Sequence, residues 1–238
     1  MAQLRSVFFY LGLAPVTVFF CVLGALMLPL PRRWRYYAVI QWSRFALWWL
    51  KSTCGLSWRV SGAELIPSSA GVILCKHQSA WETMALQFVF PPHCQVVKRE
   101  LLWVPFFGWG LASLNPIAID RAAGSKALRT VLREGKERIG SGWWILLFPE
   151  GTRVPIDQPG KYSPSGTALA IQAKCPIVPV AHNAGLFWPR QALRKVPGVI
   201  ELVIGPPVYP DGRSAAELLA EAETWIETTC RQLPPFRS

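Results

Sequence analysis

The feature that most restricts the fold of this chain is an uncharged stretch near its start. Val7 to Leu30 contains no acidic or basic side chain over about 24 residues, and a helix of that length can cross a hydrocarbon core of roughly 30 Å. Pro15 can bend such a helix, and Pro29 and Pro31 end it. A cleaved signal peptide is the competing interpretation, but the apolar part is long and no small-residue cleavage site follows it. We therefore expect a membrane-associated helix.

A basic and aromatic segment follows this stretch directly, as is typical of a membrane interface. Its residues are Arg32, Arg33, Trp34, Arg35, Tyr36 and Tyr37. The chain has a formal net charge of +11, and residues 1–60 contain no Asp or Glu at all. This distribution favours an anionic membrane surface and, by the positive-inside tendency, places the basic end on the cytoplasmic side. We expect no nucleic-acid partner, because long apolar runs separate the basic residues and no nucleic-acid motif is present.

A second apolar segment, Tyr37 to Leu50, is rich in tryptophan but is interrupted by Gln41 and Arg44. It is short and polar for a membrane span and is typical of an interfacial helix. One true span and a helical hairpin in one leaflet both stay open, and a buried helical pair of a soluble protein is the third alternative. We expect residues 1–55 to anchor the chain and residues 56–238 to form the functional domain.

From Leu56 onward, short apolar runs alternate with helical patterns, which favours an α/β domain with a central sheet flanked by helices. The expected strands are Ser57–Val60, Gly71–Cys75, Gln95–Val97, Ile117–Ile119, Trp144–Phe148, Ile177–Val180 and Ile200–Ile204. The expected helices include Trp81–Phe90, Ser125–Ile139 capped by Ser125, and a last helix that starts at Ser214 with a capping box to Glu217. The six cysteines are scattered without metal-ligand spacing, which indicates reduced core residues, a cytosolic compartment and no metal site.

His77 lies where the expected strand Gly71–Cys75 gives way to a helix, at the edge of the sheet where ligands bind. Glu82 follows five positions later. The two side chains meet only if His77 precedes the helix and Glu82 lies in its first turn, with Ser79 as the N-cap. The pair would then be a general base and its orienting carboxylate. The alternative is a capping box, in which Glu82 accepts a hydrogen bond from the Ser79 amide and His77 has no chemical role.

Charged side chains also follow three other apolar runs. They come from Lys98, from Asp120 and Arg121, and from Phe148-Pro149-Glu150-Gly151-Thr152-Arg153. Because parallel strands deliver such residues to the ligand-binding edge, we expect these charges near His77. Gly151 permits close approach of the backbone, and Arg153 can hold a phosphate in a bidentate fork. For each charge taken alone, a solvated strand end is the alternative.

Together these stretches resemble the four motif blocks of the glycerolipid acyltransferases, specifically the bacterial 1-acylglycerol-3-phosphate acyltransferases. The blocks are His77-x4-Glu82, Lys98-x-Glu100-Leu101 with Pro105, Gly108 and Ile119-Asp120-Arg121, then Phe148 to Arg153, and Val178-Pro179-Val180. The resemblance covers roughly residues 57–206. It implies an α/β acyltransferase fold and the transfer of a fatty acyl group from a thioester to the sn-2 hydroxyl of lysophosphatidic acid, which forms phosphatidic acid in phospholipid synthesis.

The resemblance also implies roles for individual residues. His77 would be the general base and Glu82 its orienting carboxylate. The substrate-binding residues would be Lys98, Arg121, Glu150, Gly151, Thr152 and Arg153, with Lys98 and Arg153 on the acceptor phosphate. No cofactor is implied. The partners would be a membrane lipid as acceptor and an acyl-CoA or acyl carrier protein thioester as donor, at the cytoplasmic side of the inner membrane.

Three positions depart from the family pattern. Glu82 stands where Asp is most common, Lys76 stands where Asn is common, and the loop Tyr162 to Gly166 lacks a basic residue often found there. The charge of Lys76 is expected to lower the basicity of His77. Acylation of another lysolipid and a catalytically silent membrane-binding module therefore stay open as alternatives. A covalent route through Cys75 or Ser79 is a further alternative.

Overall fold

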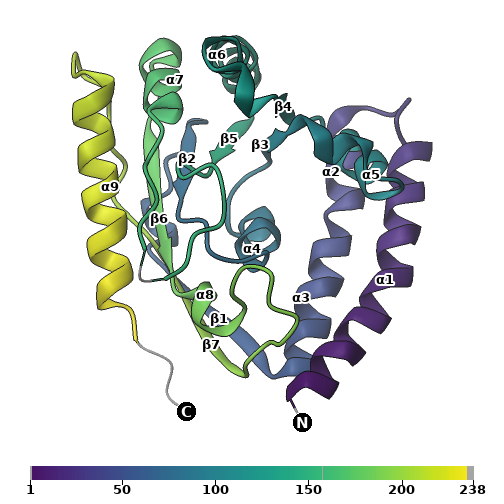
Figure 1. The fold of residues 1–238 in the computed structure, drawn as a ribbon. Helices are drawn as coiled ribbons and strands as arrows, with labels where there is room; N and C mark the ends of the chain where they lie inside the picture. The colour runs from purple at the N-terminus through teal and green to yellow at the C-terminus, as the bar shows by residue number, and fades with distance from the viewer. Residues whose placement is uncertain (1, 157, 235–238) are drawn as a thin grey trace.

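The computed structural model describes residues 2–156 and 158–234 of the chain (Figure 1). Three helices come first: α1 (Ala2–Leu26), α2 (Arg32–Val39) and α3 (Gln41–Cys54). The strands are β1 (Leu56–Ser61), β2 (Val72–Cys75), β3 (His93–Lys98), β4 (Ile117–Ile119), β5 (Trp144–Leu147), β6 (Ile177–His182) and β7 (Gly198–Ile204). The other helices are α4 (Trp81–Val89), α5 (Phe107–Ser113), α6 (Ser125–Gly140), α7 (Ser165–Ala173), α8 (Ala184–Phe187) and α9 (Ala215–Gln232), with short 3-10 helices η1 (Ala63–Leu65), η2 (Arg99–Trp103) and η3 (Arg121–Ala123).

The expected secondary structure is largely confirmed. Each strand predicted from the sequence is present, and its ends lie within two residues of the prediction. The capping box of α9 is also present, since the Ser214 and Glu217 side chains each bond the backbone of the other residue. The prediction that Ser125 caps α6 is wrong. Gly124 takes the cap position with φ at +49°, and no side chain caps that helix.

The sheet has the order β1-β7-β6-β2-β5-β3-β4 and is mixed rather than wholly parallel. Only β6 and β7 pair antiparallel among the described strands. The central strand β2 pairs parallel with β5 on one side and β6 on the other. All four β2 side chains are buried, as expected for a strand covered on both faces. The carboxyl ends of β6, β2 and β5 therefore meet at one edge, where ligands bind in such folds.

Helices cover both faces of the sheet (Figure 1). One apolar core joins α1, α3 and α4 to the sheet, and a second core joins α6, α7 and α9 to its other face. α9 shows why these helices dock, because Leu218, Ala222 and Ile226 recur at four-residue spacing and are all fully buried. The edge of the sheet where the strands β6, β2 and β5 end is thus held between two layers of packed helices.

The first helix lies against the domain along its length. The Trp49 indole of α3 donates to the Phe9 carbonyl of α1, with 3.1 Å between nitrogen and oxygen. Near the other end of α1, a Cβ added at Gly24 would lie 2.7 Å from the Ser113 hydroxyl of α5, so the glycine permits this close crossing. Yet many apolar side chains of α1 face outward, among them Leu4, Phe8, Leu11, Phe19 and Leu26. The alternative of a buried helical pair is therefore wrong for α1, which is also long and apolar enough to cross a membrane.

Candidate active site

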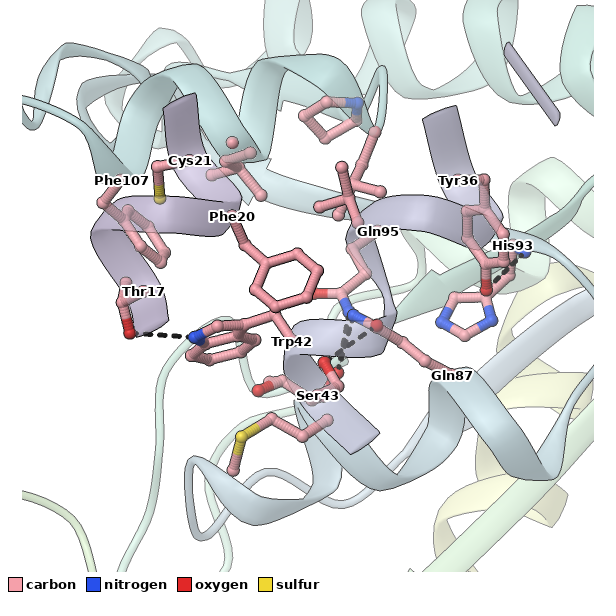
Figure 2. A pocket seen from close by; sticks show the side chains of 17 residues that line it. Thr17, Phe20, Cys21, Tyr36, Trp42, Ser43, Gln87, His93, Gln95 and Phe107 are labelled. Carbon is pink, nitrogen blue, oxygen red and sulfur yellow. Dashed lines mark hydrogen bonds between the residues drawn. The ribbon is translucent and has the colours of Figure 1, made fainter. Parts of the chain in front are cut away.

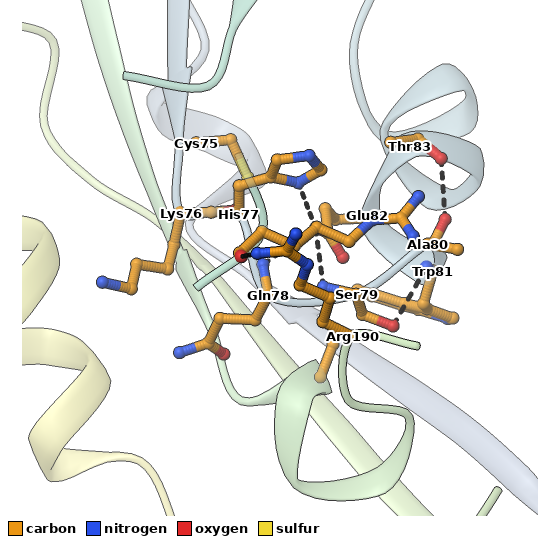
Figure 3. Close-up of polar contacts among 12 residues, drawn as sticks. Cys75, Lys76, His77, Gln78, Ser79, Ala80, Trp81, Glu82, Thr83 and Arg190 are labelled. Carbon is orange, nitrogen blue, oxygen red and sulfur yellow. Dashed lines mark hydrogen bonds and ion pairs between the residues drawn. The ribbon is translucent and has the colours of Figure 1, made fainter. Parts of the chain in front are cut away.

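His77 and Glu82 meet at the turn from β2 into α4 (Figure 3). His77 Nδ1 lies 2.8 Å from Glu82 Oε1, and the Glu82 side chain is fully buried while that of His77 is 12% exposed. Oε1 also accepts hydrogen bonds from the backbone N–H groups of Gln78 and Ser79, at 3.1 and 2.9 Å. The predicted contact is confirmed, and so is the backbone bond of the capping alternative, because one carboxylate makes both.

The helix start differs from the prediction in one detail. Ala80, not Ser79, takes the N-cap position of α4. The Ser79 hydroxyl instead accepts a hydrogen bond, at 3.2 Å, from the N–H of Trp81, which is the first helical residue. Glu82 thus lies in the first turn of the helix and His77 outside it, as their contact requires.

The charge on Glu82 is stabilised by its neighbours. Burial works against the ionised carboxylate, but His182, His77 and the Ser79 amide outweigh it and hold the pKa of Glu82 below its ordinary value. An ionised Oε1 accepts hydrogen bonds, so Nδ1 of His77 carries the ring proton and Nε2 is left as the basic nitrogen. The pair therefore has the orientation of a general base and its supporting carboxylate.

The Lys76 side chain is paired with two carboxylates on the side away from His77. It turns away from His77 (Figure 3), and its Nζ lies 2.8 Å from Glu150 Oε1 and 2.6 Å from Glu227 Oε1. Burial disfavours the charged ammonium, but these two carboxylates outweigh burial and raise the pKa of Lys76. Tyr162 completes the cluster by donating to Glu227 Oε1 at 2.8 Å. The charge of Lys76 is thus neutralised within a buried ion cluster.

The loop after β5 is fastened to the backbone of His77. Glu150 Oε2 accepts from the His77 N–H at 2.8 Å, and the Val154 N–H donates to the His77 carbonyl, also at 2.8 Å. The Phe148 ring stacks on the His77 ring with 3.9 Å between centroids. Arg153, which precedes Val154, is therefore held beside the site, as the sequence predicts for the Phe148 to Arg153 stretch.

The comparisons with known proteins agree with this site. Residues 57–183 match the Acyltransferase family. A 1-acyl-sn-glycerol-3-phosphate acyltransferase from Pseudomonas aeruginosa is 47% identical over 98% of this chain and 93% of its own length. The chain belongs to the acyltransferase family.

Two further relatives extend the comparison. The human 1-acyl-sn-glycerol-3-phosphate acyltransferase alpha is 28% identical over 76% of this chain and 65% of its own length. The crystal structure of a 1-acyl-sn-glycerophosphate acyltransferase from Thermotoga maritima matches with a TM-score of 0.80 and 23% identity, and covers 100% of this chain and 98% of that one. The predicted resemblance and fold are both confirmed.

A groove beside the His77–Glu82 pair contains several predicted binding residues. Arg121, Gly151 and the backbone side of Glu150 line it, together with Lys161 of the following loop. Phe148 forms part of the same wall and stacks on His77, so the groove adjoins the base. The Glu150 side chain itself is fully buried, which assigns it to the ion cluster.

The other predicted binding residues lie around this groove. Lys98 is exposed and pairs with Glu100 at 3.2 Å, and the Glu100 charge also acts on Arg121. Thr152 is exposed on the loop. The Arg153 carbonyl accepts from Arg190 at 3.2 Å, and Arg190 lies at the site in Figure 3. Arg121 and Gly151 thus line the groove that adjoins His77, and Arg153 lies on the loop fastened to His77, whereas Lys98, at the end of β3, is not among the described residues that line the groove.

A separate, apolar cavity lies beside α4 (Figure 2). Thr83 and Met84, which directly follow Glu82, form part of its wall. The rest comes from α1, α2, α3, β3 and α5, including Phe20, Tyr36, Trp42, Gln95 and Phe107. Trp42 is fixed by the hydrogen bond from its indole to Thr17, at 2.8 Å. The cavity therefore lies between the first three helices and α4, the helix that begins directly after the turn containing His77.

The covalent alternative has little support from the geometry. Cys75 is fully buried, and burial raises the pKa of its thiol well above the ordinary value. Ser79 is buried too, and its hydroxyl is engaged by the Trp81 amide. Neither residue has the exposed, activated character of a nucleophile.

Sequence reasoning missed three residues near this site: His182, Arg190 and Glu227. His182 ends β6 and lies behind Glu82, with its Nε2 3.9 Å from Glu82 Oε2. A polar residue at the end of an apolar run is the signal that identified His77, so His182 could have been found in the same way. Glu227 carries no such signal, because it lies mid-helix on α9.

Proposed function

We propose that this chain is a 1-acyl-sn-glycerol-3-phosphate acyltransferase, which moves a fatty acyl group from a thioester to the sn-2 hydroxyl of lysophosphatidic acid. The observation that carries the proposal is the His77–Glu82 contact of 2.8 Å, fastened through Glu150 and Val154 to the loop that bears Arg153. A base beside an anion-binding loop suits an acceptor with both a hydroxyl and a phosphate.

The acyl transfer follows from the orientation of His77. The acceptor oxygen attacks the thioester carbonyl carbon while its proton passes to Nε2, and Glu82 stabilises the imidazolium through Nδ1–H. When the tetrahedral intermediate collapses, the C–S bond breaks and His77 returns the proton to the departing thiolate. One C–O bond forms and one C–S bond breaks, without an acyl-enzyme and without a cofactor.

The oxyanion of that intermediate needs hydrogen-bond donors other than the first amides after His77. The Gln78 and Ser79 amides are bound to Glu82, and the Trp81 amide is bound to the Ser79 hydroxyl. These three amides are therefore already bonded within the turn and do not point to a free oxyanion site.

The acceptor phosphate binds on the cationic side of the site. Arg121 and Lys161 line the groove next to Phe148, and Arg153 lies on the loop fastened to His77. Arginine is suited to the bidentate binding of a phosphate. Lys98, which pairs with Glu100 at 3.2 Å, is not among the residues that line the groove in the described part of the chain.

The acyl chains enter from the bilayer. The apolar cavity between α1, α3 and α4 suits a hydrocarbon chain, because its wall reaches Thr83, one residue from Glu82. The protein is membrane-associated through α1, and both ends of α1 are fastened to the domain, at Phe9 and at Gly24. These two contacts favour a helical hairpin lying in one leaflet over a perpendicular span. The basic residues that follow α1 favour a domain at the cytoplasmic face of the inner membrane.

The direct test is an assay of the purified full chain in mixed phosphatidylglycerol and phosphatidylcholine vesicles. Lysophosphatidic acid is supplied with acyl-CoA in one arm and with acyl carrier protein thioester in the other, and phosphatidic acid is measured. We expect product in at least one arm, and a loss of kcat of about 10²- to 10⁴-fold in His77→Ala, the range usual for a general base. Absence of product in both arms from folded protein would refute the proposal.

Two acceptors without the phosphate monoester serve as controls for the substrate class. Both lysophosphatidylcholine, whose headgroup is a zwitterionic phosphodiester, and an uncharged monoacylglycerol carry an acceptor hydroxyl but lack the net negative headgroup expected for the groove. We expect at least about 10-fold lower kcat/KM for each, since a hydrogen bond to a charged group contributes about 1.5–3 kcal/mol. Equal rates on all three acceptors would argue instead for an acyltransferase acting on another lysolipid.

A further inference from the structure

A second histidine, His182, lies behind the catalytic pair. It is the last residue of β6, and its side chain is fully buried. Its Nδ1 accepts a hydrogen bond from the Ala184 N–H at 3.2 Å, so the proton of the neutral ring is on Nε2. That Nε2–H donates to the Lys76 carbonyl at 2.8 Å. Backbone groups on both sides of the ring therefore fix its tautomer.

The same nitrogen faces the second oxygen of Glu82. While Oε1 of Glu82 accepts from His77 and from two amides, Oε2 is buried and accepts no hydrogen bond within the described part of the chain. His182 Nε2 lies 3.9 Å from Oε2. A buried carboxylate oxygen without a donor is unfavourable unless a polar group lies close to it. The N–H dipole of His182 supplies such a group.

The charges around His182 agree with this arrangement. Burial lowers the pKa of His182, against the opposing effects of Glu82 and the Lys76 carbonyl, so the ring is neutral near pH 7. The other groups that face it are His77 and Lys76, the Trp81 ring, whose centroid lies 6.2 Å from that of His182, and the Cys230 thiol, whose Sγ lies 3.7 Å from the His182 carbonyl. Glu82 is therefore the ionised member of this pair, and His182 is neutral and donates its Nε2–H to the Lys76 carbonyl.

We propose that His182 is a positioning residue for acyl transfer, which holds the peptide before His77 and stabilises the Glu82 carboxylate that orients the His77 ring. It acts through the Lys76 carbonyl and Glu82. This places the ends of β6 and β2 in one polar unit, with His182 at its buried end and His77 at its exposed end. The role goes beyond the motif blocks and rests on the proposed acyl transfer.

The first experiment compares His182→Leu with His182→Gln in the full chain. Leu removes the N–H donor but keeps apolar volume, whereas the Gln side chain can place an amide N–H near the position of Nε2. For His182→Leu we expect kcat to fall about 10- to 100-fold, the size usual for groups that orient a functional side chain from behind. KM should change by no more than about 2-fold, because no substrate contact is lost. His182→Gln should recover most of the lost kcat.

The matched control is Asn183→Leu, at the neighbouring buried position. The Asn183 amide bonds the Glu201 N–H and the Pro234 carbonyl but neither Glu82 nor Lys76. All rates are normalised to the folded fraction from circular dichroism. We expect Asn183→Leu to lower the Tm while its kcat per folded molecule stays within about 2-fold, as for a change that acts on stability alone. A kcat of His182→Leu that is equally unaffected would overturn the proposal.

A double-mutant cycle tests whether His182 acts through Glu82. If it does, the loss of kcat caused by His182→Leu should shrink to no more than about 3-fold in a Glu82→Gln background, because only the hydrogen bond to the Lys76 carbonyl is then lost. Additive losses of kcat in the double variant would contradict the assignment.

A final measurement does not depend on substrate or on a folded variant. Nitrogen-15 NMR of histidine-labelled wild-type protein reports which ring nitrogen carries the proton. We expect His182 to be protonated on Nε2 and His77 on Nδ1. An Nδ1–H tautomer at His182 would overturn the positioning role even if acyl transfer is confirmed. The expected tautomers together with no acyl transfer would refute only the proposed function.

Discussion

The backbone N–H of His77 donates to Oε2 of Glu150 at 2.8 Å, from a loop 73 residues further along the chain. The other oxygen of the same carboxylate lies 2.8 Å from Lys76 Nζ. One buried side chain therefore holds both the main chain of His77 and the side chain of Lys76. The Glu of the Phe148 to Arg153 motif thus acts on the acceptor site indirectly, by fixing where β2 ends.

Replacing Glu150 should destabilise the fold as well as slow the reaction. In Glu150→Ala, the His77 amide loses its partner, and Lys76 keeps only Glu227. We expect the free energy of unfolding to fall by about 3–5 kcal/mol, the usual effect of breaking a buried ion pair. Guanidinium titration followed by tryptophan fluorescence measures it.

Two variants make the Glu150 result specific. Glu150→Gln keeps an acceptor for the His77 amide but loses the charge, so its loss of stability should be smaller. Glu137→Ala removes an exposed carboxylate of α6 and should change stability by no more than about 0.5 kcal/mol. Equal stability of Glu150→Ala and Glu137→Ala would contradict the role of the ion cluster.

The depressed pKa of Glu82 makes a prediction about acid stability. Because the folded protein holds this pKa below the ordinary 4.5, the unfolded chain binds a proton at Glu82 first as the pH falls. The stabilisation from Glu82 is complete above about pH 4.5 and is lost as the pH falls through the folded value. We therefore expect the difference in unfolding free energy between wild type and Glu82→Gln to shrink below pH 4.5. Urea titrations at pH 7, 5, 4 and 3 measure this difference, and a constant difference would be the contrary result.

Local patterns were enough to predict the part of the site that is close in sequence. The alternation of apolar runs located the seven strands, and the strand-to-helix turn predicted that His77 and Glu82 would touch. The contact between Lys76 and Glu227 joins residues 151 positions apart and has no local signature. The repulsion predicted between Lys76 and His77 did not take these partners into account, since they come from the β5 loop and from α9.

The helix N-caps also show that local sequence patterns do not predict tertiary contacts. Ser125 and Ser79 both have the residue type of an N-cap, yet Gly124 and Ala80 take those positions. Packing of α4 against the sheet and the bond of Glu82 to the Ser79 amide fix where that helix begins. Propensity predicted the helices, and tertiary contacts decided their first residues.

The cations of the groove should determine the affinity for the acceptor. Arg121 and Lys161 both line it. We expect Arg121→Gln and Lys161→Gln each to raise KM for lysophosphatidic acid by about 10-fold or more, from the loss of a charged hydrogen bond, while kcat changes little. Initial rates over a series of acceptor concentrations at saturating donor measure both constants.

A control variant separates this effect from overall charge. Arg129 is exposed on α6 and lies outside the groove lining, so Arg129→Gln should leave KM within about 2-fold. The KM of a monoacylglycerol, which has no phosphate, should also be unaffected by Arg121→Gln. If all three variants raise KM alike, the effect comes from the net charge of the surface rather than from phosphate binding in the groove.

The basic residues of α2 should determine how strongly the protein binds anionic membranes. Arg33 is exposed on α2 beside Trp34, which is 68% exposed, whereas α9 with Arg231 lies across the sheet from α1 (Figure 1). Reversing one charge at a membrane surface changes the free energy of binding by about 2 kcal/mol, at about 1 kcal/mol for each unit of charge. We therefore expect Arg33→Glu to bind vesicles rich in phosphatidylglycerol about 10- to 30-fold more weakly by sedimentation, and Arg231→Glu to bind like wild type. The difference should narrow in 1 M salt, where the screening length falls to about 3 Å. Equal binding of the two variants at low salt would mean that α2 faces away from the lipid.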